Sequence, residues 1–462
     1  MSGMVMPPSS SSTYKAVNHS ARAAWGMIAL VTVVTVGLGF YLSLAMAIYP
    51  QHDKGFAIVH RDPYTHAYDP IALAELGLPP DSSSENVLPA NPEVRSVSVH
   101  SNLVVLTAAG IVMRTIPLAK PITNLQQLKD TLSDPAWIEE ESSGRYILKA
   151  AVITYGGTEL LVGSPHVSEV KMLDMPSVFI GTKGGSLVFD GVIVRAVDAA
   201  SVNSEKYQPF IMATDNATMS MRNSLFNNLG WDWNASYGVS WVHGSTGEVS
   251  DTVFEKSFIG VYTSRADGLR FLDSTFRDNY LYGLDPHTYS KNLTIDGVTA
   301  EGNGAHGIIF SDHVTDSVIK NSVIYGNGEN GIMMDEHSTN NVIEDNTVYS
   351  NTGDGLVTSL SPDNMFRSNN VYGNRVGIRV DERDARSTQV VGNTITGNNK
   401  AFENIDLPAS NVVHNNGGQW NPRILMYVWT GVALCLLTFA ATYLLTRNRH
   451  RKDRKPSLVL VS

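Results

Sequence analysis

The fold of this chain is decided by a repeat, and residues 279–310 contain the beginnings of two successive copies: NYLYGLDPHTYSKNLTIDGVTAEGNGAHGIIF. Each copy begins with an asparagine, has a glycine four residues later and continues with a short stretch in which apolar residues alternate with others. Across residues 238–399 the glycine recurs every 22 to 24 residues and the asparagine every 23 or 24. A fixed period in the low twenties is typical of a solenoid, in which each unit buries its apolar face against the next.

The side-chain pattern within each copy favours a parallel β-helix. Leucine-rich repeats share the period, but they need leucines at offsets where this chain has valine, isoleucine and asparagine. A strand is expected after each glycine, as in residues 307–311 and 331–335, with its first and third side chains pointing inward. Second strands are expected at 341–344 and 346–349. We interpret the asparagine column as stacked side chains that fix the corners.

Two long uncharged stretches flank the repeat region. Residues 25–49 and 424–446 are each long enough to cross a bilayer as a helix, and a basic tail at 447–462 follows the second. The positive-inside rule then predicts a cell-membrane protein with two spans, both termini cytoplasmic and the β-helix outside the cytoplasm. A cleaved signal peptide is the alternative for the first stretch.

Composition sets the other boundaries. Residues 1–24 are expected to be a short cytoplasmic tail, and residues 50–95 a proline-rich lead-in. Residues 96–410 are expected to form the β-helix catalytic domain, with a short helix at 124–132 as its cap. The predicted fold class is therefore all-β, a parallel β-helix between two single transmembrane helices. The single cysteine, Cys435, lies in the second apolar stretch, so the domain is expected to hold together without disulfides.

Charge limits the classes of partner. The chain has 34 Lys and Arg against 44 Asp and Glu, and its formal net charge is −10. Six of the basic residues lie in the C-terminal tail, so the region between the apolar stretches is still more acidic. Nucleic acid is therefore excluded as a partner. An anionic substrate requires basic residues that gather locally.

Outward positions of the repeats gather polar and aromatic side chains around one copy. Neighbouring rungs of a β-helix stack about 4.8 Å apart, so residues at matching positions share one surface patch. A sugar ring would cover such a patch. The outward residues that carry this chemistry are Tyr262, Arg265, Tyr282, Asp285, His287, His306 and Ser311.

The motif Tyr282-Gly283-Leu284-Asp285-Pro286-His287, on a β-helix with asparagine turns, resembles the mannuronan C5-epimerases, which convert mannuronate to guluronate within alginate. The resemblance extends over roughly residues 100–400, and His306-Gly307-Ile308-Ile309 is similar to the family's next rung. It implies a right-handed parallel β-helix and an isomerase whose partner is an anionic polysaccharide. It also implies that His287 and Tyr282 are the acid/base pair and that Asp285 supports them.

The chain departs from the family in the following rung. Some members have an arginine there that neutralises the substrate carboxylate, whereas this chain has Ser311-Asp312-His313. Asp312 carries the wrong charge, so we expect Arg265 or protonated His313 to take that role, or a different substrate. Tyr262, His306 and Ser311 complete the expected substrate contacts. The calcium-binding repeats of the secreted members are missing, so no metal or other cofactor is expected.

The chemistry of epimerisation suits these residue types. Inverting C5 of a uronate removes a proton from one face of the ring and returns one to the other, with a donor or cation on the carboxylate. Histidine titrates near neutrality and tyrosine is protonated there. We expect His287 to be the base and Tyr282 the acid, and the reverse assignment stays open.

Two other functions stay open at this point. A polyuronate lyase would use the same proton abstraction and then eliminate the O4 substituent. A non-catalytic β-helix would only bind polysaccharide. The expected membrane tether also predicts a polysaccharide synthase or export complex as a partner.

Overall fold

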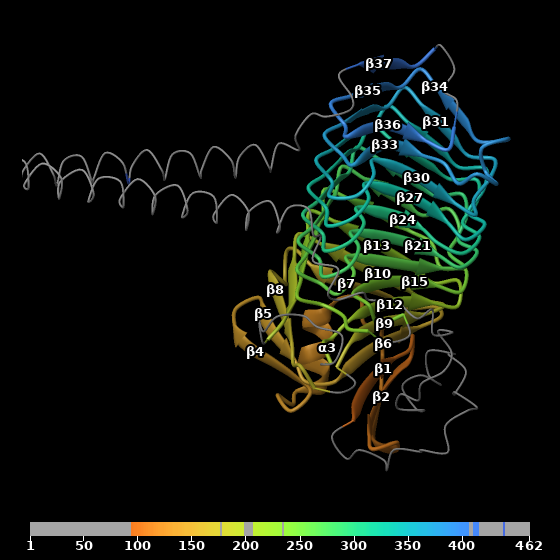
Figure 1. The fold of residues 1–462 in the computed structure, drawn as a ribbon. Helices are drawn as coiled ribbons and strands as arrows, with labels where there is room; N and C mark the ends of the chain where they lie inside the picture. The colour runs from red at the N-terminus through yellow and green to blue at the C-terminus, as the bar shows by residue number, and fades with distance from the viewer. Residues whose placement is uncertain are drawn as a thin grey trace, which may run out of the picture. The chain divides into compact units, whose positions relative to one another are not determined.

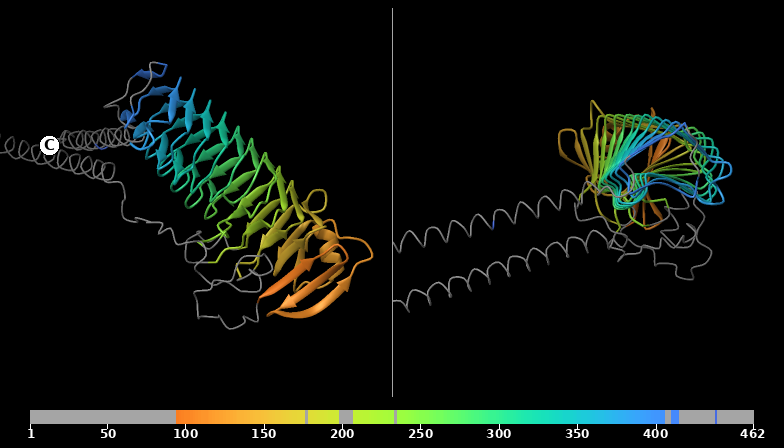
Figure 2. Two further views of the ribbon diagram at one scale, coloured as in Figure 1. Left: turned by 90° about the vertical axis from the view of Figure 1, so that its right-hand side faces the viewer. Right: turned by 45° about the horizontal axis from the view of Figure 1, so that its top comes forward.

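The computed structural model describes residues 94–175, 178–197, 207–232, 235–405 and 410–414, and also Thr438. This part of the chain winds into a parallel β-helix with three sheets, one strand per sheet in each turn (Figure 1, Figure 2). The prediction of a parallel β-helix is confirmed.

The first sheet has 14 strands among the described residues. They are β1 (Arg95–Val99), β2 (Leu103–Ala108), β3 (Ile111–Pro117), β6 (Ala151–Tyr155), β9 (Ile180–Lys183), β12 (Ile211–Thr214), β15 (Val239–Val242), β18 (Val261–Ser264), β21 (Leu284–His287), β24 (Ile308–Phe310), β27 (Ile332–Asp335), β30 (Leu356–Ser359), β33 (Val376–Arg379) and β36 (Lys400–Glu403). Only the hairpins β1–β2 and β2–β3 within it are antiparallel.

The second and third sheets have 10 and 13 strands in the described part of the chain. The second contains β7 (Glu159–Gly163), β10 (Ser186–Asp190), β13 (Thr218–Arg222), β16 (Glu248–Ser250), β19 (Arg270–Leu272), β22 (Thr294–Asp296), β25 (Val318–Lys320), β28 (Val342–Glu344), β31 (Met365–Arg367) and β34 (Gln389–Val391). The third contains β4 (Ile138–Ser142), β5 (Arg145–Leu148), β8 (Glu169–Met172), β11 (Ile193–Ala196), β14 (Leu225–Asn227), β17 (Val253–Glu255), β20 (Thr275–Arg277), β23 (Thr299–Glu301), β26 (Val323–Tyr325), β29 (Thr347–Tyr349), β32 (Asn370–Tyr372), β35 (Thr394–Thr396) and β37 (Val412–His414).

The 24-residue period stacks equivalent side chains on top of one another. In the first sheet Leu284 pairs with Ile308, and Ile308 pairs with Ile332. The inward positions one and three after each glycine are buried, as the alternation predicts. On the third sheet Phe254 stacks between Phe226 and Phe276, with ring centroids 5.2 and 5.3 Å apart. Stability therefore comes from columns of like side chains that continue through many turns.

The asparagine column forms a buried ladder of hydrogen bonds. The side chain of Asn303 donates to Oδ1 of Asn327 at 2.9 Å, and Asn327 donates to Asn351 in the same way. Gly283 lies against this ladder, and a Cβ there would come within 2.9 Å of Nδ2 of Asn303 and 2.6 Å of the carbonyl oxygen of Gly307. The glycines and asparagines therefore share one period because each glycine lies in close contact with an asparagine of the ladder. The interpretation that the asparagines have a structural role is confirmed.

Breaking this ladder in the middle is expected to destabilise the fold. Asn327→Ala removes the side-chain hydrogen bonds to Asn303 and Asn351 and leaves the buried backbone N–H of Asn303 without its acceptor, so unfolding free energy should fall by about 2 to 4 kcal/mol. Asn370→Ala is the matched control, since Asn370 is exposed on β32. Urea unfolding of both variants measures the difference. Equal midpoints would show that the ladder contributes nothing beyond ordinary packing.

A helix caps the N-terminal end of the solenoid, as the sequence predicts. Helix α3 (Leu125–Leu132) begins at Asn124, whose side chain accepts a hydrogen bond from the backbone of Gln127 at 2.9 Å. Its buried leucines, Leu125, Leu128 and Leu132, join the core of the β-helix. The cap covers apolar surface that would otherwise be open at the first turn.

The predicted membrane spans at 25–49 and 424–446 lie outside the described residues, with the exception of Thr438. In the portion that is described, no helix is long and apolar enough to cross a membrane. This finding corrects the predicted localisation as a cell-membrane protein with two spans and both termini cytoplasmic. The tails at 1–24 and 447–462 are likewise outside the described residues, as is the lead-in at 50–95 except for its last two residues.

Candidate active site

The sequence motif lies on β21, in the middle of the first sheet. Leu284 and Pro286 point into the core, so Asp285 and His287 lie on the outer face of the same strand. Tyr262 on β18 pairs with Asp285, and Ser311, directly after β24, forms a bridge with His287. Three successive rungs thus bring predicted residues together on one outer surface, as the repeat register predicts.

Asp285 is a buried acid in the floor of this surface. Its side chain is 3% exposed, and Oδ1 has no hydrogen-bond partner among the described residues. Burial raises the pKa of Asp285 well above its usual value, because a carboxylate there would lose its hydration without compensation. The neutral acid is therefore favoured, and a neutral carboxyl group can donate a hydrogen bond.

Tyr282 and His306 form a stacked pair beside Asp285. Their ring centroids are 5.3 Å apart and the rings are parallel to within 1°. Burial raises the pKa of Tyr282, and the nearby Asp285, Glu329 and Asp335 raise it further. The phenol therefore keeps its proton at neutral pH, which suits it as an acid.

His306 is held in its neutral form. Its Nδ1 accepts the backbone N–H of Asn330 at 3.2 Å, so the proton belongs on Nε2, which lies 3.3 Å from Oε2 of Glu329. Burial, with a contribution from the charge of Arg379, lowers the pKa of His306 to about 4. His306 is therefore a neutral stacking platform under the conditions in which His287 would act as a base.

His287 is connected to an acid through a hydroxyl group. Its Nδ1 lies 2.6 Å from Oγ1 of Thr288, and Thr288 is hydrogen-bonded to Asp312. Burial alone would raise the pKa of Asp312, but hydrogen bonds with His313 and Thr288 and the charges of His287 and His313 bring it below its usual value. Asp312 is thus ionised and accepts the Thr288 proton. The hydroxyl oxygen then accepts Nδ1–H of His287, and Nε2 carries the lone pair of a base.

Removing this hydroxyl is expected to impair His287 in its predicted role as a base. Thr288→Val keeps the shape but loses the link between His287 and Asp312, so turnover should fall about tenfold and its pH dependence should shift. Thr288→Ser restores the hydroxyl and should restore both properties. The pH–rate profiles of the two variants measure this. Equal losses in the serine and valine variants would indicate a packing role for Thr288 instead.

Arg265 and His313 lie at the corner that follows the strands, around Tyr289. The guanidinium carbon of Arg265 is 6.0 Å from the centroid of the Tyr289 ring. The ring of His313 stacks with that of Tyr289, with centroids 4.7 Å apart, and Nδ1 of His313 is 2.7 Å from Oδ1 of Asp312. These two predicted carboxylate-binding residues are therefore gathered at the rim, while Asp285 lies in the floor.

Sequence reasoning missed Tyr237 as part of the site. Its ring contacts that of Tyr262 at 4.8 Å, and the ring of Tyr262 contacts that of His287 at 5.6 Å. Burial raises the pKa of Tyr237, as do Asp232 and Asp285. The available signal was its position directly before Gly238, which is the column of Tyr282 and His306. Across the described ranges no group of three or more His, Cys, Asp or Glu side chains could hold a metal ion.

Comparison with known proteins first defines the class. Residues 210–341 and 287–417 match the family model described as the right-handed β-helix region, so the predicted handedness is confirmed. Among solved structures, the periplasmic alginate epimerase AlgG superposes with a TM-score of 0.57 over 64% of this chain and 82% of that chain. At 22% identity this likeness shows the fold alone.

Curated relatives give a closer likeness in sequence. A mannuronan C5-epimerase of Pseudomonas aeruginosa is 34% identical over 310 residues, which cover 61% of this chain and 56% of the relative. The mannuronan C5-epimerase AlgG of Azotobacter vinelandii is 28% identical over 201 residues, covering 40% of this chain and 38% of the relative. The resemblance to the mannuronan C5-epimerase family is confirmed. The chain spans little more than half the length of the Pseudomonas aeruginosa relative.

Proposed function

We propose that this chain is an isomerase that inverts C5 of uronate residues within an alginate-like polysaccharide, converting mannuronate to guluronate. The observation that carries the proposal is the buried Asp285, with its unpartnered Oδ1, beside Tyr282 and on the same strand as His287. The relatives named mannuronan C5-epimerase support it. Catalysis is assigned to the domain at residues 96–410.

His287 is the proposed base. Its Nε2 takes the C5 proton, and the electron pair of that C–H bond moves into the carboxyl group to give an enolate-like intermediate. Tyr282 then donates its phenolic proton to C5 from the opposite face, and solvent returns both side chains to their starting states. The raised pKa of Tyr282 favours this direction, since a protonated phenol is an acid ready to donate.

Asp285 is the proposed donor to the substrate carboxylate. In its neutral form it shares its proton with the oxygen on which negative charge develops, which stabilises the intermediate without a cation. This role removes the difficulty posed by Asp312, whose ionised carboxylate instead supports His287 through Thr288. Substrate contacts are assigned to Tyr262, His306 and Ser311 in the floor and to Arg265 and His313 at the rim. A synthase or export complex is the proposed supplier of polymer.

Incubation with polymannuronate in deuterated water tests the proposal. Proton NMR should show guluronate signals with deuterium at C5, because the returned proton comes from groups that exchange with solvent. New unsaturated ends that absorb in the ultraviolet would identify a lyase. Binding of the polymer with neither product would leave a polysaccharide-binding β-helix and would overturn the proposed activity.

A further inference from the structure

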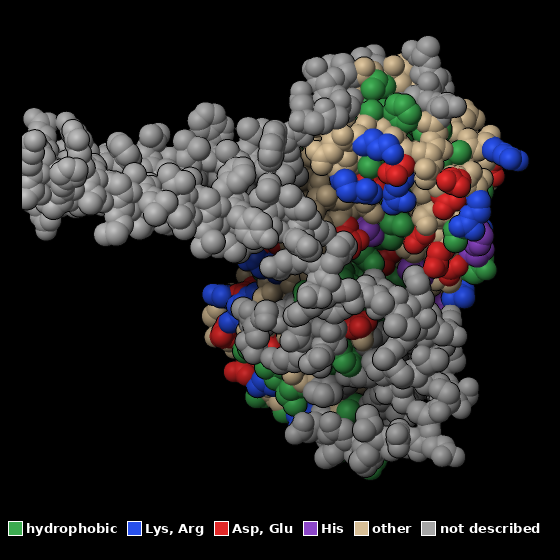
Figure 3. All heavy atoms as spheres, in the orientation of Figure 1, with side chains coloured by type: hydrophobic (Ala, Val, Ile, Leu, Met, Phe, Trp, Pro, Cys, Tyr) green, Lys and Arg blue, Asp and Glu red, His purple; other side chains and the backbone are tan. Residues whose placement is uncertain are grey.

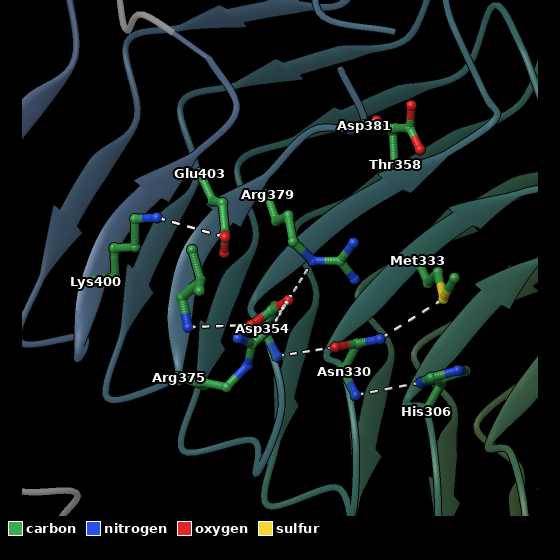
Figure 4. A network of polar contacts seen from close by, with 11 residues as sticks. His306, Asn330, Met333, Asp354, Thr358, Arg375, Arg379, Asp381, Lys400 and Glu403 are labelled. Carbon is green, nitrogen blue, oxygen red and sulfur yellow. Dashed lines mark hydrogen bonds and ion pairs between the residues drawn. The ribbon is translucent and has the colours of Figure 1, made fainter. Parts of the chain in front are cut away.

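Two arginines surround one buried carboxylate on the C-terminal side of the site. Asp354 is fully buried, and its Oδ2 accepts from Nη2 of Arg375 at 2.7 Å and from Nε of Arg379 at 2.6 Å (Figure 4). One negative charge thus faces two positive ones. Figure 3 shows Lys and Arg side chains gathered on this face, over the C-terminal strands of the first sheet. Burying a carboxylate in this way fixes both guanidinium groups in place.

The orientation of Arg379 leaves its fork toward solvent. Because Nε bonds to Asp354, the two terminal nitrogens are turned away from that carboxylate (Figure 4). The side chain is 29% exposed, so a ligand can reach it. Two parallel N–H donors on a planar group match the two oxygens of a carboxylate.

Arg379 lies in the same outward row of the first sheet as Asp285. The register pairs Ile309 with Met333, Met333 with Val357, and Val357 with Arg379. The row therefore begins with a neutral acid and ends with a cation, and between them Ile309 and Val357 are buried while Met333 is half-buried. A row that runs along the axis of the helix, with an acid at one end and a cation at the other, suits a polymer.

A continuous set of contacts joins the arginine pair to the stacked pair at the site. The backbone N–H of Asp354 donates to Oδ1 of Asn330 at 2.9 Å, and the backbone N–H of Asn330 donates to Nδ1 of His306 at 3.2 Å (Figure 4). Of the acids near this path, Asp381 is paired with Arg383, whereas Glu329 accepts a hydrogen bond from the neutral His306 and keeps its charge. Asp335, at the end of β27, opposes an anionic ligand, which makes a localised cation more important for holding one.

We propose that Arg379, positioned by Asp354 and assisted by Arg375, is a subsite that binds the carboxylate of a uronate unit in the same polymer, at a distance from the unit that reacts over Asp285. The inference rests on the proposed function, because it takes the ligand to be a polyuronate. It predicts that the polymer lies along the first sheet and that binding strengthens once the oligomer is long enough to reach Arg379.

Calorimetric titration with mannuronate oligomers of increasing length tests this subsite. The parent protein carries His287→Ala, so that bound oligomers are not converted. Arg379→Gln should weaken binding of long oligomers on the order of tenfold, while short oligomers bind alike to both proteins. Arg367→Gln is the matched control, because Arg367 pairs with Glu344 on the second sheet. Methyl esters of the long oligomers should erase the difference.

The possible results separate the subsite from the proposed function. Equal binding by the Arg379→Gln and Arg367→Gln variants would overturn the subsite, as would an equal loss for methyl esters, which would indicate a structural effect. No binding of any oligomer by the parent would instead count against the proposed function. Arg375 still pairs with Asp354 in the variant, so folding should persist. If it does not, Arg379→Lys, which keeps the charge but loses the fork, should show an intermediate loss.

Discussion

Replacing His287 with alanine should reduce the proposed conversion of mannuronate to guluronate by about a thousandfold, because the step that breaks the C5–H bond would lose its proposed base. The substitution removes the imidazole that Thr288 and Asp312 orient, and it leaves the core side chains of β21 unchanged. Rates of guluronate formation by proton NMR measure the effect. Affinity for oligomers should change little, since other residues hold the substrate.

The control for this variant is His166→Ala, because His166 is an exposed histidine far along the chain from the motif. It should retain full activity. Partial recovery of the His287→Ala variant by added imidazole would support the role of a base. If the alanine variant kept activity within tenfold of the parent, another group would have to remove the proton, and Tyr282 would be the first to consider, since the reverse assignment was open from the sequence.

The repeat could be predicted from the sequence because its period and its alternation report the same geometry. A fixed 24-residue spacing places Leu284, Ile308 and Ile332 in one column, and strand alternation then assigns Asp285 and His287 to the outer face. The asparagine ladder follows from the same period. These inferences depend only on the regular repeat of the backbone, which the spacing of the apolar residues indicates.

The corners could not be predicted in this way. Arg265 and His313 both have left-handed backbone, with φ of 53° and 67°, so strand alternation gives no direction for their side chains. They lie beside Tyr289, away from the floor of the site. The sequence shows only the charge that Asp312 would present to a substrate, whereas its contact with His287 depends on a hydrogen bond through Thr288. Asp312, whose charge is wrong for binding a carboxylate, is therefore a candidate support for His287.

Asp285 is expected to be the second most sensitive position. Asp285→Ala removes the proposed donor to the developing enolate, and turnover should fall about a hundredfold or more. Asp285→Asn keeps a neutral donor in nearly the same volume and should lose less activity. Steady-state rates on polymannuronate measure both. A larger loss in the asparagine variant than in the alanine variant would contradict a neutral donor and would indicate that the ionised carboxylate is needed.

The same carboxyl group predicts how stability depends on pH. Burial raises the pKa of Asp285 in the folded protein, whereas the unfolded chain has a value of about 4. Between these two values the folded state holds a proton that the unfolded state has released. The stabilisation linked to this proton is therefore complete below about pH 4 and is lost as the pH rises toward the folded-state pKa.

Asp285→Asn has no proton to lose, so its stability relative to the parent should increase as the pH rises from about 4 toward neutrality. Urea unfolding of both proteins across this range measures the difference. The control is Asp251→Asn, at an exposed acid, whose stability should change with pH as that of the parent does. A parent that instead gained stability over the asparagine variant with rising pH would place the folded-state pKa of Asp285 below its unfolded value. The proposed neutral-donor mechanism would then fail, because the carboxyl group would be ionised at neutral pH.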